Sequence, residues 1–327
     1  MTRWLIPVLL LLLLICAGAS LLAGTVWLRP QDVAQALIHP EGNLTGLILT
    51  EIRLPRVILA IMVGGILGLS GAVLQGLLRN PLAEPGTLGI SAGAALGAVI
   101  AIYYGFAASF VLATPLFGLL GGFLTAGLTL MLSRNGGTLS LILAGAAISS
   151  VAGAGVSLAL NLSPNPYAAY EIMTWLMGSL TDRSWDHVRL AAPFIVVGGI
   201  LLLMTGRALD ALALGETQAE SLGIHVGQTR LLALFGTALG VGAATAVAGM
   251  VGFVGLIAPH IVRPLVRHRP RRVLLPAALA GAILVVLADI ATRLVTFGVP
   301  INLGVFISVI GAPFFLWLIL HMRSRTI

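Results

Sequence analysis

The chain has 327 residues, of which 58% are hydrophobic and only 9% are charged, and its formal net charge is +7. About a quarter of the residues of a soluble globular domain are charged, so this composition excludes an ordinary water-soluble protein. A basic chain can bind nucleic acid, but in a chain this apolar the arginines are better explained as residues of cytoplasmic loops.

Apolar runs, separated by charged residues or by clusters of Pro and Gly, predict ten membrane-spanning segments. Their approximate ranges are 4–28, 57–77, 91–105, 114–132, 138–160, 190–206, 230–250, 254–266, 273–295 and 303–321. The runs at 91–105 and 254–266 are shorter than the ~20 residues of a full crossing, so we expect them to be tilted, broken or packed inside the bundle. The sequence therefore predicts an all-α polytopic membrane protein that forms a single transmembrane domain over residues 1–327.

An even number of spans places both termini on one side of the membrane, and the arginines predict which side. With cytoplasmic termini, twelve of the 18 arginines lie on the cytoplasmic side and six on the outer side. The six outer ones are Arg29, Arg53, Arg56, Arg183, Arg189 and Arg293. Because short cytoplasmic loops are enriched in Lys and Arg, this split predicts cytoplasmic termini.

Several small-residue pairs are spaced for close helix contact. They are Gly64 with Gly68, Gly93 with Gly97, Gly118 with Gly122, and Gly236 with Gly240. Each pair places two small residues on one face of a helix, which lets the backbones of two helices approach closely. We expect these glycines to pack the bundle and to have no role in activity.

The basic residues are all Arg, and the absence of Lys excludes two classes of chemistry. A P-loop needs a lysine on the β- and γ-phosphates, and a Schiff-base enzyme needs a reactive lysine. Cys16 is the only cysteine, which excludes intrachain disulfides and Cys-based metal sites. The histidines, His260 among them, are scattered without ligand spacing and are interpreted as packing residues. We expect no cofactor or metal on this chain; if ATP drives transport, another chain hydrolyses it.

The predicted spans contain very few ionisable side chains: Asp289 and Arg293 near one end of the ninth, and His260 in the eighth. Ion-coupled carriers usually place carboxylates or histidines near the membrane midplane, where function justifies their desolvation cost. The sequence therefore disfavours an ATP-independent carrier and a channel with a charged ring. It also disfavours a membrane-embedded enzyme, which needs a convergent cluster of His, Asp or Glu.

Four sequence blocks occur in order between residues 53 and 315. They include Arg79-Asn-Pro-Leu-Ala-Glu-Pro-Gly-Thr-Leu-Gly89, Gly215-Glu-Thr-Gln-Ala-Glu-Ser-Leu-Gly223, Gly252-Phe-Val-Gly-Leu-Ile-Ala-Pro-His-Ile-Val-Arg263 and Gly311-Ala-Pro-Phe-Phe315. Together they resemble the FecCD-type permeases of bacterial ABC importers for iron-siderophores, haem and cobalamin. The resemblance implies the type II ABC importer permease fold and ATP-driven import across the bacterial inner membrane. ABC permeases for bare zinc or manganese ions are a related alternative, distinguished by these blocks.

The same resemblance implies the partners. A fused two-copy permease would be about twice as long, so we expect a second copy of this chain, as a homodimer, to complete the path. Two ATP-binding subunits would carry ATP and Mg²⁺, and a periplasmic substrate-binding protein would deliver cargo. We expect a lipid bilayer around the chain and no nucleic acid. The cluster Arg267-His-Arg-Pro-Arg-Arg272 is interpreted as a topological determinant that could also contact anionic lipid.

Three arginines are candidates for docking the binding protein. The resemblance implies that Arg53, Arg56 and Arg293, on the outer side, face acidic residues of that protein. The guanidinium fork suits this task because it grips a carboxylate with two hydrogen bonds. Two alternatives remain: Arg53 and Arg56 could reach lipid headgroups, and Arg293 could pair with Asp289 four residues earlier.

Two further groups of candidate residues follow from the resemblance. The loop at about 207–229 is implied to form the coupling helices that dock in a cleft of the ATPase; a plain solvated loop is the alternative. Its candidate residues are Gly215, Glu216, Ala219, Glu220, Leu222 and Gly223, with a short helix expected between the two glycines. The translocation path is implied to run along the fifth and last spans, with a gate near the loop before the fifth. Its candidate residues are Gly137, Thr138, Ser149 and Ser150.

Overall fold

The computed structural model describes residues 2–24, 27–38, 44–110, 112–134, 136–295 and 301–323, and in these ranges the chain is helical without strands. Eight helices, one of them extended by a preceding segment, are long and apolar enough to cross a membrane. They contain α1 (Thr2–Leu22), α4 (Leu54–Leu77), α7 (Ala113–Leu132), α8 (Thr138–Asn161), α10 (Trp185–Met204), α13 (Val226–Ala248), α15 (Pro270–Leu294) and α16 (Leu303–Arg323). The two short apolar helices are α5 (Ile90–Tyr103) and α14 (Val254–Val262), the latter continued by η3 (Pro264–Val266). The ten predicted segments are thus confirmed, and so are the two expected to be short.

The second span begins earlier than predicted. Short helices α2 (Pro30–Ile38), α3 (Leu44–Leu47) and η1 (Ile48–Arg53) precede α4, and the last two run into it, giving one helix over Leu44–Leu77. The sequence placed Arg53 and Arg56 in a loop, whereas both are helical. Pro55 has no N–H to donate to the carbonyl four residues earlier, and its ring crowds that carbonyl. The helix accommodates it by widening into a π turn, in which the Leu54 N–H donates to the Leu49 carbonyl.

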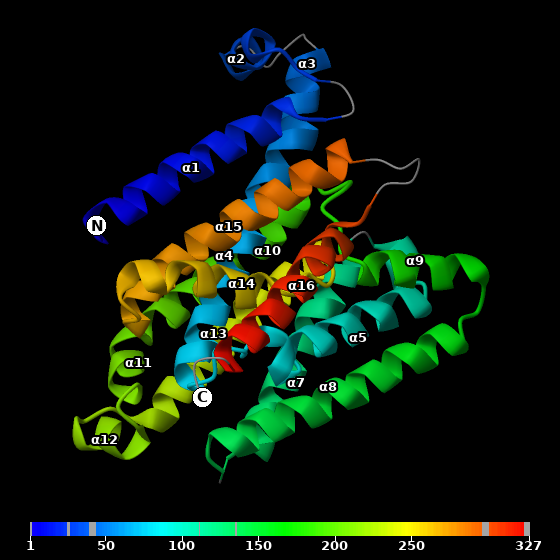
Figure 1. Cartoon of the computed structure of the whole chain (residues 1–327). Coiled ribbons are helices and arrows are strands. Elements are labelled where there is room, and N and C mark those ends of the chain that lie inside the picture. The colour runs from blue at the N-terminus through cyan, green and yellow to red at the C-terminus, as the bar shows by residue number, and fades with distance from the viewer. Residues whose placement is uncertain are drawn as a thin grey trace.

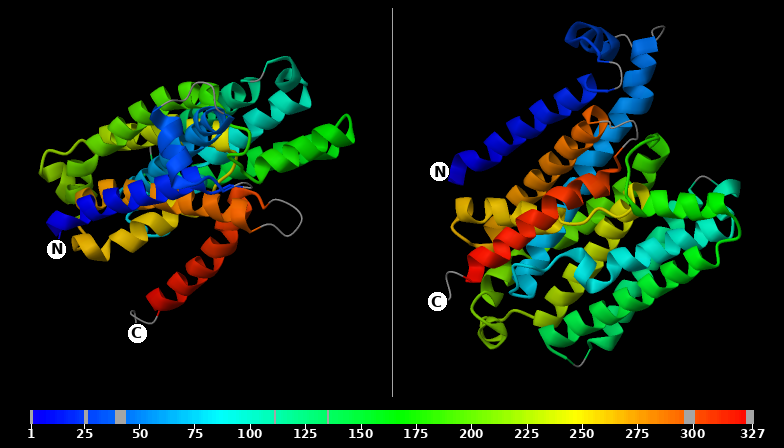
Figure 2. Two further views of the ribbon diagram at one scale, coloured as in Figure 1. Left: turned by 90° about the horizontal axis from the view of Figure 1, so that it is seen from above. Right: turned by 45° about the vertical axis from the view of Figure 1, so that its right-hand side comes forward.

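Two helices form the centre of the bundle. In α4 and α13, 78% of the most apolar window is buried, against 17% in α1 and 28% in α8 and α16. Glycines allow the central contacts: a Cβ on Gly64 would lie 2.3 Å from the Gly281 carbonyl oxygen of α15, and one on Gly97 of α5 would lie 2.0 Å from the Phe117 carbonyl oxygen of α7. The predicted packing role of these small residues is confirmed. Figure 2 shows α1 and α16 on the outside of the bundle.

The two ends of the bundle carry different short helices. Helices α11 (Gly206–Leu212) and α12 (Glu216–Ser221) lie at one end, which we call the α12 end, and α1 begins and α16 ends toward it (Figure 1). Helices α2 and α3 lie at the opposite end, which we call the α2 end. The remaining short elements are η2 (Pro85–Leu88), α6 (Phe106–Ser109) and α9 (Pro166–Leu176). The first helix therefore begins, and the last helix ends, toward the same end of the bundle, as an even number of spans requires.

Candidate functional site

Helix α12 is the short helix expected between two glycines. Gly215 has φ +121° and Gly223 has φ +82°, conformations that a residue with a Cβ adopts only with strain. After the helix, the Ile224 N–H donates to the Ala219 carbonyl at 3.0 Å and closes its last turn. Ala219 is fully buried, whereas Glu220 and Leu222 are exposed. The helix therefore presents one face to the bundle and leaves the other open.

Glu216 ties α12 to two long helices. The Thr138 hydroxyl, at the first residue of α8, donates to Glu216 Oε1 at 2.9 Å. The Arg230 guanidinium, near the start of α13, donates to the same oxygen at 2.8 Å and also to the Gly136 carbonyl at 3.4 Å. A candidate coupling residue and a candidate gate residue, predicted separately, are thus in direct contact.

The electrostatics of this contact keep Glu216 ionised at neutral pH. Burial alone would raise the pKa of its carboxyl group. The hydrogen bond from Thr138 and the charge of Arg230 act in the opposite direction, and the net result is a pKa below the ordinary value. Glu216 therefore accepts both hydrogen bonds as a carboxylate.

The other candidate path residues lie on or beside α8. Gly137 precedes the helix and is exposed, with no heavy atom within 4 Å of where a Cβ would stand. The Ser149 hydroxyl donates to the Gly86 carbonyl of η2 at 3.3 Å, whereas the Ser150 hydroxyl donates within its own helix to Ala146 at 2.9 Å. Helix α8 exposes the large apolar side chains of Leu143, Val151 and Leu158. Beside them, Ser150 belongs to a stripe of small, uncharged residues. Its other members are Ala146, Ala147, Gly153, Ala154 and Ser157.

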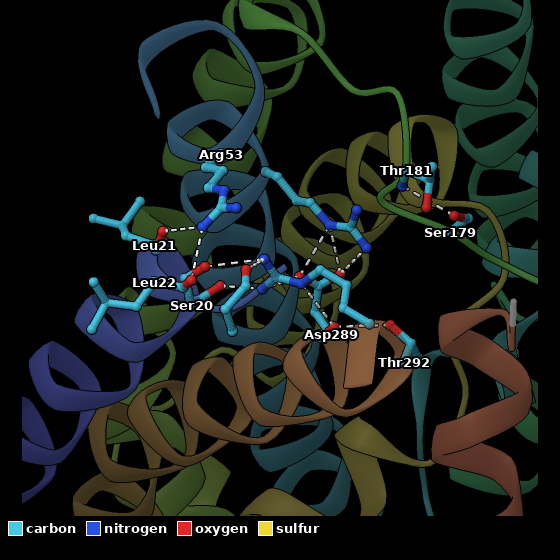
Figure 3. A network of polar contacts seen from close by, with 11 residues as sticks. Ser20, Leu21, Leu22, Arg53, Ser179, Thr181, Asp289 and Thr292 are labelled. Carbon is cyan, nitrogen blue, oxygen red and sulfur yellow. Dashed lines mark hydrogen bonds and ion pairs between the residues drawn. The ribbon is translucent and has the colours of Figure 1, made fainter. Parts of the chain in front are cut away.

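The three candidate docking arginines lie together at the α2 end, around Asp289 of α15. Asp289 is fully buried, and two guanidinium groups share its carboxylate. Arg56 Nη2 lies 2.8 Å from Oδ1, and Arg293 Nη2 lies 2.9 Å from Oδ2. Figure 3 labels Asp289, where these contacts meet. The pair of Asp289 with Arg293, the alternative foreseen from their spacing, is present. Arg56 was not expected there, since 233 positions separate it from Asp289.

The same cluster holds the end of α1. Arg53 Nη1 donates to the carbonyls of Leu21 and Leu22 at 2.6 and 2.9 Å (Figure 3). Arg293 Nη1 donates to the carbonyls of Ser20 and Ala23 at 3.0 and 2.8 Å. The last carbonyls of a helix have no partner within the helix, and its C-terminus favours positive charge. We call Arg53, Arg56, Asp289 and Arg293 the arginine clamp; it joins α1, α4 and α15.

The arginine clamp was only partly visible in the sequence. A lone carboxylate in a predicted span needs a partner, so the sequence indicated that Asp289 would be paired. The three outer arginines are exceptions to the positive-inside trend, so the sequence also indicated that they have a specific role. Another contact gave none: Arg263 donates to Gln75 Oε1, and Gln75 Nε2 donates to the Gly255 carbonyl at 3.2 Å, which joins α4 to α14. A polar residue such as Gln75 gives no indication in a sequence of which helix it will face.

Known proteins resemble this chain over most of its length. It is 39% identical over 280 residues to a hemin transport system permease of Yersinia pestis, covering 84% of each chain. It is 38% identical over 320 residues to a vitamin B12 import system permease of Salmonella typhi, covering 97% of this chain and 95% of the relative.

A solved structure and a family profile agree with these relatives. The structure, an inward-facing conformation of an ABC transporter of the metal-chelate type, superposes with a TM-score of 0.85 at 33% identity, covering 98% of this chain and 99% of the other. The profile of the FecCD transport family matches residues 10–321. This multi-pass helical chain belongs to the FecCD transport family.

Proposed function

We propose that this chain is the permease subunit of an ATP-driven importer that moves an iron chelate, haem or cobalamin across the bacterial inner membrane. The relatives named above for hemin and vitamin B12 transport, and the metal-chelate type of the solved structure, support this cargo class. They favour a bulky chelate over a bare zinc or manganese ion. The exposed stripe of α8 around Ser150, which is small, weakly polar and free of charge, suits a cargo of this kind that must not bind tightly.

The contact between Thr138 and Glu216 is the observation that carries the mechanism. Helix α12 has an open face with Glu220 and Leu222, which would dock on an ATP-binding subunit carrying ATP and Mg²⁺. Its other side is bonded through Glu216 to α8 and α13. A movement of the ATPase that displaces α12 would therefore also displace α8, the long helix beside the path, as in a shear motion of packed elements.

A second copy of this chain would complete the path. Helices α8 and α16 are both largely unburied within one chain, and α16 exposes large apolar side chains such as Leu316 and Trp317. Lipid or a second copy would cover these faces. We propose a homodimer with α8 and α16 toward the path.

The α12 end would face the cytoplasm, because the basic cluster at 267–272 lies in the turn before α15 and in the first turn of α15, and the ATPase is cytoplasmic. The α2 end would then receive the binding protein. Arg53, Arg56 and Arg293 would meet its acidic residues while also holding α1.

The experiment that tests this function is reconstitution in liposomes. With an ATP-binding subunit and a substrate-binding protein from the same transport system, we expect ATP-dependent uptake of ferric siderophore, haem or cobalamin. Without them we expect no accumulation. Gradient-driven accumulation by this chain alone would contradict the proposal, and ATP-dependent uptake of Zn²⁺ or Mn²⁺ in place of a chelate would contradict the cargo class.

The docking role is tested by charge reversal. We expect Arg53→Glu with Arg56→Glu to abolish both binding of the substrate-binding protein and uptake. Asp289→Asn, which loosens the arginine clamp but keeps every arginine, is the matched control and should retain the binding. Equal loss of binding in the two variants would assign the arginines to holding α1 only.

A further inference from the structure

A groove runs between the beginning of α1 and the beginning of α15, at the α12 end. Its volume is about 400 Å³. Leu5 and Ile6 of α1 form one wall, and Leu275 and Pro276 of α15 form the other, with Val266 of η3 beside them. Arg271 and Arg272 also line it. The groove therefore combines apolar walls with two cationic side chains.

Among the residues that the structure describes, no side chain pairs with either of the two cations. Arg271 and Arg272 are exposed, and within the part of the chain that the structure describes neither guanidinium group has a hydrogen bond or an ion pair. The sequence has no Asp or Glu between Glu220 and Asp289. Asp210 of α11 does reach this place, but its carboxylate accepts from the Arg271 backbone N–H at 2.9 Å. It caps α15 and leaves both guanidinium groups available.

The cationic and the apolar residues that line the groove follow each other along α15. Arg271 and Leu275, like Arg272 and Pro276, are one helical turn apart, which is about 6 Å along the axis. Leu275 is 43% exposed, and α1 is the least buried of the apolar helices, so the groove opens toward the bilayer. Basic groups at the membrane surface attract anionic headgroups, and an apolar groove beside them suits an acyl chain.

We propose that this groove binds one anionic phospholipid. Its phosphate lies between Arg271 and Arg272, and one of its acyl chains runs along Leu5, Ile6 and Leu275. The lipid fills the contact between α1 and α15 at this end, whereas the arginine clamp makes that contact at the α2 end. A free phosphate would use only the two arginines and would leave the apolar walls empty.

The headgroup is tested by measuring retained lipid on the purified full chain with native mass spectrometry. The probes are phosphatidylglycerol and phosphatidylcholine with the same acyl chains, and glycerol phosphate as a headgroup without chains. Arg271→Gln with Arg272→Gln should weaken phosphatidylglycerol binding about thirtyfold, because each basic residue attracts an anionic lipid by about 1 kcal/mol. Arg267→Gln with Arg269→Gln removes the same charge outside the groove and should leave the binding unchanged.

The acyl chain is tested by filling the groove. Ile6→Trp should lower phosphatidylglycerol occupancy, whereas Leu11→Trp, on an exposed part of α1, should not. Equal binding of phosphatidylcholine, equal loss in both arginine double variants, or unchanged binding in Ile6→Trp would each overturn the proposal. Binding of glycerol phosphate as tight as that of the lipid would show an anion site in place of a lipid site. If the Arg271 and Arg272 double variant does not fold, two measurements still test the proposal. One compares phosphatidylglycerol with phosphatidylcholine on the wild-type chain, and the other compares Ile6→Trp with Leu11→Trp.

Discussion

Thr138 and Glu216 are joined by a hydrogen bond of 2.9 Å, although 78 positions separate them in the chain. Thr138 is the first residue of α8 and Glu216 the first of α12, so the bond links two helix beginnings. Because Arg230 donates to the same carboxylate oxygen, a displacement of α12 acts on α8 and α13 together.

Removing one hydroxyl should weaken this link without unfolding the chain. Thr138→Val keeps the shape of the side chain and loses the hydrogen bond to the carboxylate, which contributes about 1.5 kcal/mol, a factor of about ten in an equilibrium. We expect uptake per ATP hydrolysed to fall by a similar factor in reconstituted transporter while ATP hydrolysis continues. Thr217→Val, an exposed neighbour of Glu216 on α12, is the control. A normal ratio in Thr138→Val, or the same loss in Thr217→Val, would contradict a transmitting role.

The link should also depend on pH. The pKa of Glu216 in the folded chain lies below its ordinary value of 4.5, so its carboxylate stabilises the fold above that value. This contribution is lost as the pH falls through the folded pKa. The melting temperature of wild type should exceed that of Glu216→Gln at neutral pH, and the difference should shrink as the pH falls below the ordinary value. Arg230→Gln should move this loss to higher pH; a difference that stays constant in acid would rule the assignment out.

Asp289 should be a main source of stability at the α2 end. Asp289→Asn leaves two mostly buried guanidinium groups without their shared counter-charge, and breaking such a buried pair costs roughly 3–5 kcal/mol. A lower melting temperature in detergent, together with faster proteolysis near the end of α1, is expected. Asp186→Asn breaks an exposed pair with Arg189 and should change the melting temperature little. Similar melting temperatures for the two variants would be evidence against the arginine clamp.

The contact between α4 and α15 should not tolerate even one methyl group. A Cβ on Gly68 would lie 2.2 Å from the Ala277 carbonyl oxygen, so Gly68→Ala must push the helices apart. Overpacking of this kind typically costs about 1–3 kcal/mol. At Gly65, on the same helix, the nearest atom is 3.8 Å away, and Gly65→Ala should fold normally. Thermal unfolding of both variants measures the difference, and equal melting temperatures would disprove the close contact.

Hydropathy was sufficient to predict the ten segments because the free-energy cost of exposing an apolar run to water depends only on the residues of that run. It even separated α5 and α14 from the full-length helices. It failed at residues 44–56, where Glu51, Arg53, Pro55 and Arg56 suggested a loop. Arg53 and Arg56 are hydrogen-bonded or paired by other helices, and the backbone accommodates Pro55 in one π turn.

The candidate site was predictable in its parts and not in its connections. The glycines that bracket α12 act through local backbone geometry, so the sequence alone indicated that helix. The bond from Thr138 to Glu216 and the pair of Arg56 with Asp289 join segments far apart in the chain. Such pairs depend on which helices are neighbours, and the pattern of hydropathy carries no information on that.

The unbroken helix over Leu44–Leu77 has 34 residues and would be about 51 Å long if it rose at a uniform 1.5 Å per residue. The hydrocarbon core of a bilayer is only about 30 Å thick, so this rod must lean strongly or stand well clear of the lipid. In the second case, a protein that binds the first residues of this helix could displace the whole helix, which reaches to the centre of the bundle. The π turn before Pro55 interrupts the regular hydrogen bonding of the helix, so the helix would bend there first.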